Sequence, residues 1–215
     1  MPSELTTDGI QRVVHKFVEA TGRALEAGFD VAEIHSAHGY LLNEFLSPIS
    51  NHRRDNYGGS FENRTRLVRE IVSAIRKIWP DGKPLFLRIS ATDWKEPDGW
   101  TIEQSVELAR TLKSLGVDLI DCSSGGLVPD AIVPAVPGYQ VPFAEKIRRE
   151  AGMATGAVGF ITSGEQADHI IRNGQADLVL LARQFLRDPY FPLHAAADLH
   201  VDIPWPKQYN RAKES

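Results

Sequence analysis

The chain has 215 residues, of which 42% are hydrophobic and 24% charged, and its formal net charge at pH 7 is -4. This composition predicts a folded globular protein. Because the chain has no large positive charge, nucleic acid or an anionic membrane is not expected as its main partner, and we expect a small molecule instead. Cys122 is the single cysteine, so no internal disulfide forms, and no apolar stretch or signal pattern predicts membrane insertion or export. We therefore expect a cytoplasmic protein.

The first elements are a helix and a strand followed by a long loop. Apolar residues recur at helical spacing from Ile10 to Val18, with Asp8 as a candidate N-cap and Gly28 as a candidate end. Residues 31–35 then read as a short buried strand. The stretch 36–60 has no long periodic element and is too long to be a simple connector, so we expect it to carry function.

The same alternation continues to the end of the chain. One helix is expected after Ser60 as N-cap, with an apolar stripe from Leu67 to Ile78, and a second after the capping box of Thr101 and Gln104, ending at Gly116. Two further helices are expected at 139–151 and 165–173. Strands are expected at 85–90, 117–122, 155–161 and 177–182. This alternation predicts βαβ units, a parallel sheet and one domain over residues 1–215.

Two α/β architectures compete, an open doubly wound sheet and part of an eight-stranded (β/α)8 TIM-type barrel. A doubly wound sheet usually has a glycine-rich turn after its first strand, and the segment from His35 to His38 is not one. Polar residues just past the strand ends favour the barrel. Five expected strands, however, correspond to only about the last five βα units of such a barrel.

His35, His38 and Tyr40 lie at the end of the first strand and are the first candidate site. Two imidazole N–H groups aimed at one oxygen would polarise it, and the Tyr40 phenol could deliver a proton. A hydrogen-bonded structural pair and a metal site remain alternatives for the histidines, and a cavity wall for the tyrosine. A metal is disfavoured because no third ligand lies at a recognisable spacing.

Arg88 is the second candidate, because a guanidinium in the middle of a buried strand needs an anion or several acceptors. The alternatives are a bound ligand and an internal ion pair with Asp93 or Asp121.

The loops after the last two strands are the third candidate. Gly159 and Phe160 follow one strand, while Ala182 and Arg183 follow the other. In barrels, the loops after the seventh and eighth strands often hold a phosphate, although a plain turn would also explain each segment.

Several motifs extend the argument from chemistry to family. They are EIHSAHGYLLNEFLSP at 33–48, NHR at 51–53, DNYGGSFENR at 55–64, LRIS at 87–90, DCSSG at 121–125, PGYQ at 137–140 and QYNR at 208–211. Together they resemble the old yellow enzyme family, in its bacterial NADPH dehydrogenase and xenobiotic reductase branch. The resemblance covers essentially the whole chain.

The resemblance implies an FMN-containing barrel that takes hydride from NADPH or NADH and passes it to the activated C=C bond of α,β-unsaturated carbonyl or nitro compounds. By this likeness His35 and His38 bind the substrate oxygen and Tyr40 donates the proton. Arg88 lies beside the flavin ring, while Gly159, Phe160, Ala182 and Arg183 lie near its phosphate. Arg211, in a C-terminal tail at 200–215, resembles an arginine that enters a neighbouring subunit's site, which implies a homodimer or higher oligomer.

The chain departs from the family at two points. Ala182 stands where glycine is usual, which should do little harm because the backbone N–H remains. The family's N-terminal βα units are not in this sequence, and an open sheet leaves unpaired edges. We expect such a chain to associate, or to need a chain that supplies the missing strands. A non-catalytic flavin- or phosphate-binding fragment and a metal-dependent barrel lyase are the rival functions.

Overall fold

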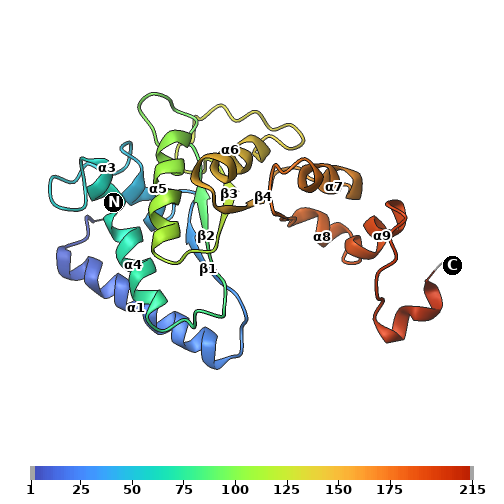
Figure 1. Cartoon of the computed structure of the whole chain (residues 1–215). Helices are drawn as coiled ribbons and strands as arrows, with labels where there is room; N and C mark the ends of the chain where they lie inside the picture. The colour runs from blue at the N-terminus through green and yellow to red at the C-terminus, as the bar shows by residue number, and fades with distance from the viewer. Residues whose placement is uncertain (1–2, 214–215) are drawn as a thin grey trace.

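The core of the molecule is a five-stranded parallel sheet with the strand order β1-β2-β3-β4-β5 (Figure 1). The structure is a computed structural model and describes residues 3–213. The strands are β1 (Ala32–Ser36), β2 (Leu85–Ser90), β3 (Leu119–Ser123), β4 (Ala154–Ala157) and β5 (Leu178–Val179). Each strand pairs with the next one along the chain, which is the order found in a (β/α)8 barrel rather than in a doubly wound sheet.

Helices fill the connections between the strands. They are α1 (Thr7–Glu26), α2 (Leu41–Leu46), α3 (Phe61–Arg64), α4 (Arg66–Arg76), α5 (Ile102–Ser114), α6 (Val141–Ala151), α7 (Gly164–Arg172), α8 (Arg183–Arg187), α9 (Phe191–Asp198) and the 3₁₀ helix η1 (Lys207–Ala212). Between residues 3 and 213 no helix is long and apolar enough to cross a bilayer.

The two faces of the sheet differ because alternate side chains point to opposite sides. One face, here the outer face, carries Ile34, Leu87 and Ile120, which are all buried. The helices that pack on this face carry apolar stripes of their own. In α4, for example, the buried residues are Leu67, Val68, Ile71, Val72 and Ile75. Packing of these stripes on the outer face forms the hydrophobic core.

The opposite, inner face carries a row of side chains that lie at the same level of the sheet. In the parallel register His35 pairs with Arg88, Arg88 with Asp121, and Asp121 with Gly156. His35 is exposed and Arg88 is partly buried, whereas Asp121 is fully buried. The three strands therefore place an imidazole, a guanidinium and a carboxylate side by side.

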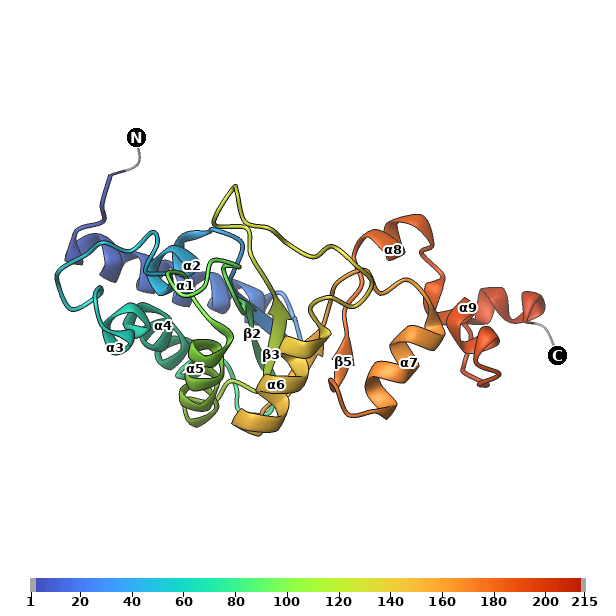
Figure 2. The same cartoon turned by 90° about the horizontal axis from the view of Figure 1, so that it is seen from above.

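The molecule is elongated, and the sheet does not close on itself (Figures 1 and 2). Helices α1 to α5 lie towards one end, whereas α7, α8, α9 and the C-terminal segment lie towards the other. Strands β1 and β5 form the two edges of the sheet. Phe29, Val31 and Leu178 remain exposed beside these edges.

Several predicted boundaries are wrong. Thr6, not Asp8, caps the first helix, and its hydroxyl accepts a hydrogen bond from the backbone N–H of Gly9. Ser60 does cap a helix, but the helix is divided at Thr65 into α3 and α4, and Ile78 lies beyond it and is exposed. The last two strands are much shorter than expected, because residues 158–161 and 180–182 form loops.

Candidate active site

The structure brings His35, His38 and Tyr40 together at the carboxyl end of β1. The ring centroids of His35 and His38 are 5.2 Å apart, and those of His35 and Tyr40 are 5.4 Å apart. Tyr40 is 66% exposed and is therefore open to solvent. Their position follows from the strand end, since all three fall within or directly after β1.

Two loops hold His38 in place. Its backbone has a φ of 59°, and the following Gly39 has a φ of 73°. A Cβ added at Gly39 would lie 2.6 Å from the carbonyl oxygen of Gly126, and one added at Gly126 would lie 2.7 Å from the Cα of His38. The loops after β1 and β3 therefore touch through their backbones, and only glycine permits this approach.

Ser90, the last residue of β2, joins the same two loops. Its hydroxyl accepts a hydrogen bond from the backbone N–H of His38 at 2.9 Å and donates to the carbonyl of Gly125 at 2.7 Å. The buried Ser90 hydroxyl thus accepts one hydrogen bond and donates another, and both bonds help to position His38.

The side chain of His38 contacts a second serine. Nε2 of His38 lies 2.6 Å from Oγ of Ser123, which is 3.4 Å from Oε1 of Gln140. The Ser124 hydroxyl donates to the same Oε1 at 2.6 Å. Nε2 of His38 is thus engaged with Ser123, as donor or as acceptor depending on the tautomer of the ring. This contact holds the imidazole ring of His38 in place.

Both histidines are electrically neutral near pH 7. Burial, then the nearby Arg88 guanidinium and His35, lower the pKa of His38 from 6.5 to about 4. Burial followed by Arg88 also lowers the pKa of His35. Neutral imidazoles donate hydrogen bonds without adding a positive charge, which suits groups that bind an uncharged carbonyl or nitro oxygen.

Arg88 pairs with Asp121, one of the two carboxylates expected as an internal partner. Nη1 of Arg88 lies 3.0 Å from Oδ2 of Asp121. Asp93 is occupied elsewhere, because its Oδ2 accepts hydrogen bonds from the Ser47 hydroxyl and the Trp100 backbone. The Arg88 side chain is still 26% exposed, and its Nε is a buried atom for which no hydrogen-bond partner occurs among the described residues. The ion pair therefore leaves Arg88 donor capacity for a ligand.

The predicted phosphate residues lie beyond β4 and β5. Gly159 has a φ of 124° and Phe160 a φ of 48°, so the chain turns sharply after β4. The guanidinium of Arg183 stacks over the Phe160 ring at 4.8 Å. Ala182 is the N-cap residue of α8. The structure thus joins these two loops, although by a cation–π contact that the sequence did not reveal.

Arg211 stands apart from the other predicted site residues. It belongs to η1, at the end of the molecule remote from β1 (Figure 2). It therefore does not contribute to the His35–His38 site of its own chain. No group of three or more His, Cys, Asp or Glu side chains within 3–213 is arranged to hold a metal ion.

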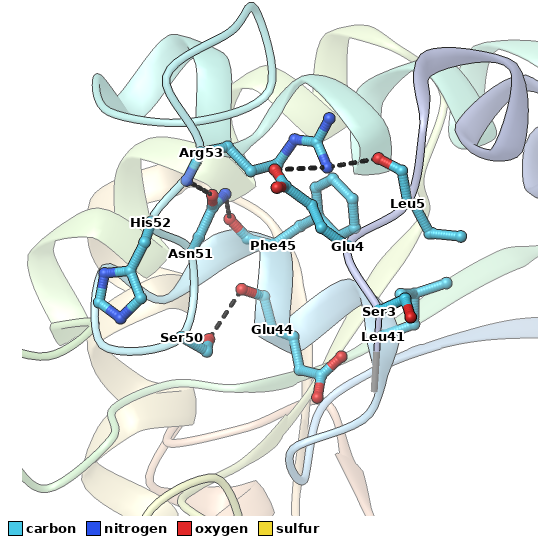
Figure 3. A pocket seen from close by; sticks show the side chains of 10 residues that line it. All are labelled: Ser3, Glu4, Leu5, Leu41, Glu44, Phe45, Ser50, Asn51, His52 and Arg53. Carbon is cyan, nitrogen blue, oxygen red and sulfur yellow. Dashed lines mark hydrogen bonds and ion pairs between the residues drawn. The ribbon is translucent and has the colours of Figure 1, made fainter. Parts of the chain in front are cut away.

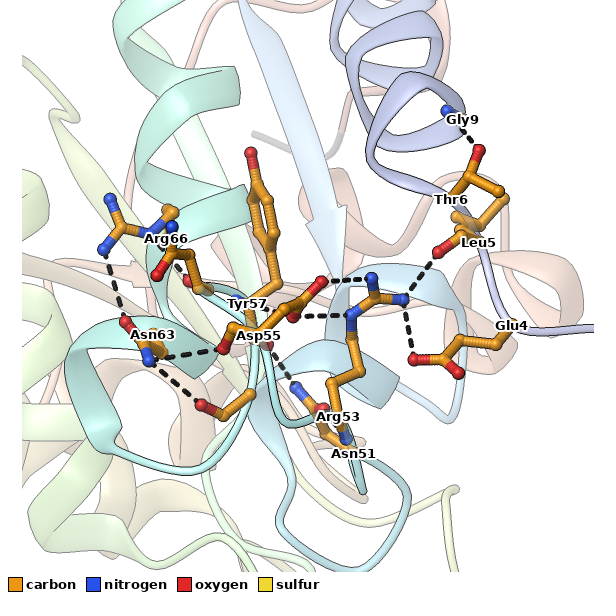
Figure 4. A network of polar contacts seen from close by, with 12 residues as sticks. Glu4, Leu5, Thr6, Gly9, Asn51, Arg53, Asp55, Tyr57, Asn63 and Arg66 are labelled. Atoms are coloured by element: carbon orange, nitrogen blue, oxygen red, sulfur yellow. Dashed lines mark hydrogen bonds and ion pairs between the residues drawn. The ribbon is translucent and has the colours of Figure 1, made fainter.

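A pocket of about 340 Å³ is lined by the N-terminal segment, by residues of α2 and by the loop at 50–53 (Figure 3). Its polar groups are largely occupied: Arg53 pairs with Glu4 and Asp55 and donates to the carbonyl of Leu5 (Figure 4). The Arg53 guanidinium also lies 5.7 Å from the Phe45 ring centroid. We interpret this pocket as the place where the N-terminal segment is held against the rest of the fold.

Ser90, Ser123 and Gln140 were missed by the sequence reasoning. Both serines end neighbouring strands of the expected parallel sheet, so the strand positions alone placed them at the carboxyl edge. Gln140 gave no such signal, because it is the N-cap residue of α6 and reaches the site only through the packing of that helix.

Comparison with known proteins gives consistent results. The NADH:flavin oxidoreductase / NADH oxidase family matches residues 1–202. An NADPH dehydrogenase of Geobacillus sp. (strain WCH70) is 57% identical over 210 residues, and one of Bacillus subtilis (strain 168) is 54% identical. In both cases the match covers 98% of this chain and 61% of the relative, so the chain spans less than two thirds of their length.

Solved structures of related enzymes share the fold. A morphinone reductase in complex with tetrahydroNAD has a TM-score of 0.75 at 27% identity, over 97% of this chain and 54% of that one. A 2-naphthoyl-CoA reductase complex has a TM-score of 0.84 at 27% identity, over 91% of this chain and 30% of that one. The sheet is accordingly part of a parallel α/β barrel. The chain belongs to the NADH:flavin oxidoreductase / NADH oxidase family.

Proposed function

We propose that this chain forms the C-terminal part of an FMN-dependent NAD(P)H oxidoreductase that reduces the activated C=C bond of α,β-unsaturated carbonyl or nitro compounds. The observation that carries the proposal is the grouping of His35, His38 and Tyr40 beside Arg88 at one edge of the sheet. Family membership and the NADPH dehydrogenase relatives support the cofactor pair of FMN and NADPH or NADH.

The residues fit FMN. Arg88 retains a buried Nε without a hydrogen-bond partner among residues 3–213, on the inner face of the sheet. A flavin ring presents acceptor atoms along one edge, which a guanidinium matches. Arg183 and the backbone at Gly159, Phe160 and Ala182 offer a cation and N–H groups for the phosphate. When bound, FMN supplies the hydride to the alkene.

The chain's own residues would bind and polarise the substrate. His35 and His38 donate hydrogen bonds to the carbonyl or nitro oxygen, which withdraws electron density from the β-carbon and favours hydride transfer to it. Tyr40 holds the proton that completes the reduction at the α-carbon. Arg88 stabilises negative charge at the neighbouring ring, and the serine contacts of His38 keep its donor fixed.

Arg211 suggests the assembly. Because it lies away from its own site, we propose that it enters the site of a second copy in a homodimer or higher oligomer. A chain that contributes the remaining barrel strands would be a further partner. We assign the reaction to the cytoplasm, where reduced nicotinamide cofactors are available.

The test is to purify the chain, alone and together with the N-terminal part of a relative, and to measure bound flavin and NADPH-driven reduction of cyclohexenone. We expect a yellow protein and turnover that His38→Ala and Tyr40→Phe both reduce. A colourless protein that ignores added FMN in both preparations would reject the proposal. Bound flavin without turnover in both would instead favour a non-catalytic flavin-binding role.

A further inference from the structure

Asp121 is a buried ionisable group that the proposed reaction does not use. It lies in the middle of β3 and has no exposed surface. Its register neighbour on one side is Arg88 of β2, and on the other side it is Gly156 of β4, which has no side chain to donate a hydrogen bond. The carboxylate therefore depends on Arg88 for its stabilisation.

The contact between the two groups is close but incomplete. Nη1 of Arg88 and Oδ2 of Asp121 are 3.0 Å apart, which makes an ion pair. Within residues 3–213, neither oxygen of Asp121 has an aligned hydrogen-bond partner, and neither does Nε of Arg88. The pair is held by charge rather than by a bidentate hydrogen-bonded geometry, so its strength depends on the ionisation of the carboxyl group.

The other titratable groups near the pair come from β1, the loop that follows it, and β3. They are Glu33 and His35 on β1, His38 beyond its end, and Cys122 next to Asp121 on β3. Burial and the Asp121 carboxylate raise the pKa of the Cys122 thiol, which therefore stays uncharged. Both histidines are neutral near pH 7, for the reasons given above. Glu33 adds negative charge on the same face as Asp121 and therefore disfavours a second carboxylate there.

We propose that Asp121 is the positioning residue of Arg88: its carboxylate holds the guanidinium on the inner face, and its protonation changes the net charge that the pair presents there. Protonated Asp121 leaves the charge of Arg88 uncompensated, whereas ionised Asp121 cancels it. The link to flavin binding rests on the proposed function, whereas the link between the two side chains does not.

The carboxyl group of Asp121 changes its charge close to neutral pH. Burial is the main cause that raises its pKa to about 7, with a smaller rise from Glu33, while Arg88 acts in the opposite direction. The pair is then net positive below pH 7 and net neutral above it. A ligand with an electron-rich or anionic edge beside Arg88 should bind more tightly at the lower pH.

The first experiment needs no flavin. The carboxyl carbon of Asp121 is followed by ¹³C NMR from pH 4 to 9 in the wild-type chain and in Arg88→Gln. We expect a titration midpoint near 7 in the wild type and a higher midpoint in Arg88→Gln, because the stabilising cation is lost. An ordinary midpoint near 4, or one that Arg88→Gln does not move, would overturn the proposal.

The second experiment measures FMN binding from pH 6 to 8 for the wild type, Asp121→Asn and Asp30→Asn. Asp30 is an equally charged, 92% exposed residue near the opposite end of β1 and serves as the control. The phosphate of FMN titrates in this range as well, so the relevant quantity is the ratio of wild-type to variant dissociation constants. For Asp121→Asn we expect this ratio to increase by about five- to tenfold between pH 6 and 8, and for Asp30→Asn to stay constant.

A constant ratio for Asp121→Asn, confirmed as folded by circular dichroism, would overturn the charge role. If Asp121→Asn does not fold, the Arg88→Gln titration decides the question. If the wild type binds no FMN at any pH while the Asp121 midpoint still responds to Arg88→Gln, the proposed function fails for this chain and the pairing of the two residues stands.

Discussion

At the scale of single residues, the contact between His38 and Ser123 constrains the imidazole ring of His38. Nε2 of His38 and Oγ of Ser123 are 2.6 Å apart, and which of them donates depends on the tautomer. We expect Ser123→Ala to remove this constraint and to change the proportion of the two neutral tautomers, which ¹⁵N chemical shifts of the imidazole distinguish. Ser124→Ala is the matched control, because Ser124 contacts Gln140 and Trp94 instead. Imidazole shifts that Ser123→Ala leaves unchanged would contradict this role of Ser123.

The lowered pKa of His38 has a consequence for stability. In the folded chain the pKa is about 4, against 6.5 for an unperturbed histidine, so the unfolded chain binds more protons between these values. The free energy of unfolding therefore decreases as the pH falls from about 6.5 to about 4. We expect His38→Gln to remove this contribution, so that its urea-derived stability falls less over that interval than that of the wild type. If the stability of the wild type and of His38→Gln decreased in parallel as the pH falls, His38 would not be desolvated in the folded chain.

The positions of the site residues were predictable to the extent that they depend on strand ends. His35, His38 and Tyr40 lie within six positions of each other, so one strand terminus is enough to bring them together. The choice between Asp93 and Asp121 as the partner of Arg88 could not be made from the sequence, since it depends on the register of β2 with β3. Gln140, the N-cap residue of α6, depends on the packing of that helix and was missed for that reason.

At the scale of elements, the capping box of α5 is a local signal that the structure confirms. The Thr101 hydroxyl accepts from the backbone N–H of Gln104, and the Gln104 side chain accepts from that of Thr101. We expect Thr101→Ala to lower the free energy of unfolding by about 1 kcal/mol. Thr111→Ala, in the same helix but away from its N-terminus, should leave stability unchanged or raise it slightly because alanine is the better helix former. Urea denaturation of both variants provides the measurement.

The elements that the sequence mispredicts are the short ones. Helix α2 has six residues, too few for a periodic pattern, and it lies inside the stretch that was read as a loop. Strand β5 has two paired residues, although the apolar run that contains it is longer. Strand length is limited here by pairing with β4, which is itself short, so an apolar run alone overestimates it.

The N-terminal segment is held to the fold mainly by Arg53. Its side chain is 10% exposed, pairs with Glu4 and Asp55, and donates to the carbonyl of Leu5 at 2.7 Å (Figure 4). We expect Arg53→Ala to increase hydrogen exchange in the backbone of residues 4–10, measured by mass spectrometry. The exposed neighbour Arg54 offers the control, and Arg54→Ala should leave the exchange of this segment unchanged. Equal exchange in all three chains would mean that packing, rather than Arg53, fixes the segment.

At the scale of the whole molecule, the sheet has five strands where a closed barrel of this type has eight. The parallel sheet and the placement of helices between its strands were predictable, because they follow from the alternation of elements. The strand order does not follow from alternation, which fits a doubly wound sheet as well as a barrel. The open sheet leaves β1 and β5 with unpaired backbone edges and leaves part of the inner face, including Glu33 and His35, exposed. In a closed barrel these surfaces would face the interior, and we propose that exposed edges of this kind promote association.

Association of the 215-residue chain should therefore take place through the sheet edges. Val31 is 42% exposed beside β1 and Leu178 is 43% exposed on β5. In sedimentation velocity experiments we expect the sedimentation coefficient of the wild-type chain to rise with protein concentration. We expect Val31→Lys and Leu178→Lys to weaken this rise, because a charge at a sheet edge opposes strand pairing. Ile132 is 89% exposed on the loop after β3, so Ile132→Lys tests apolar exposure away from the edges. If Ile132→Lys weakens association and the edge variants do not, the loop rather than the open sheet is the contact surface.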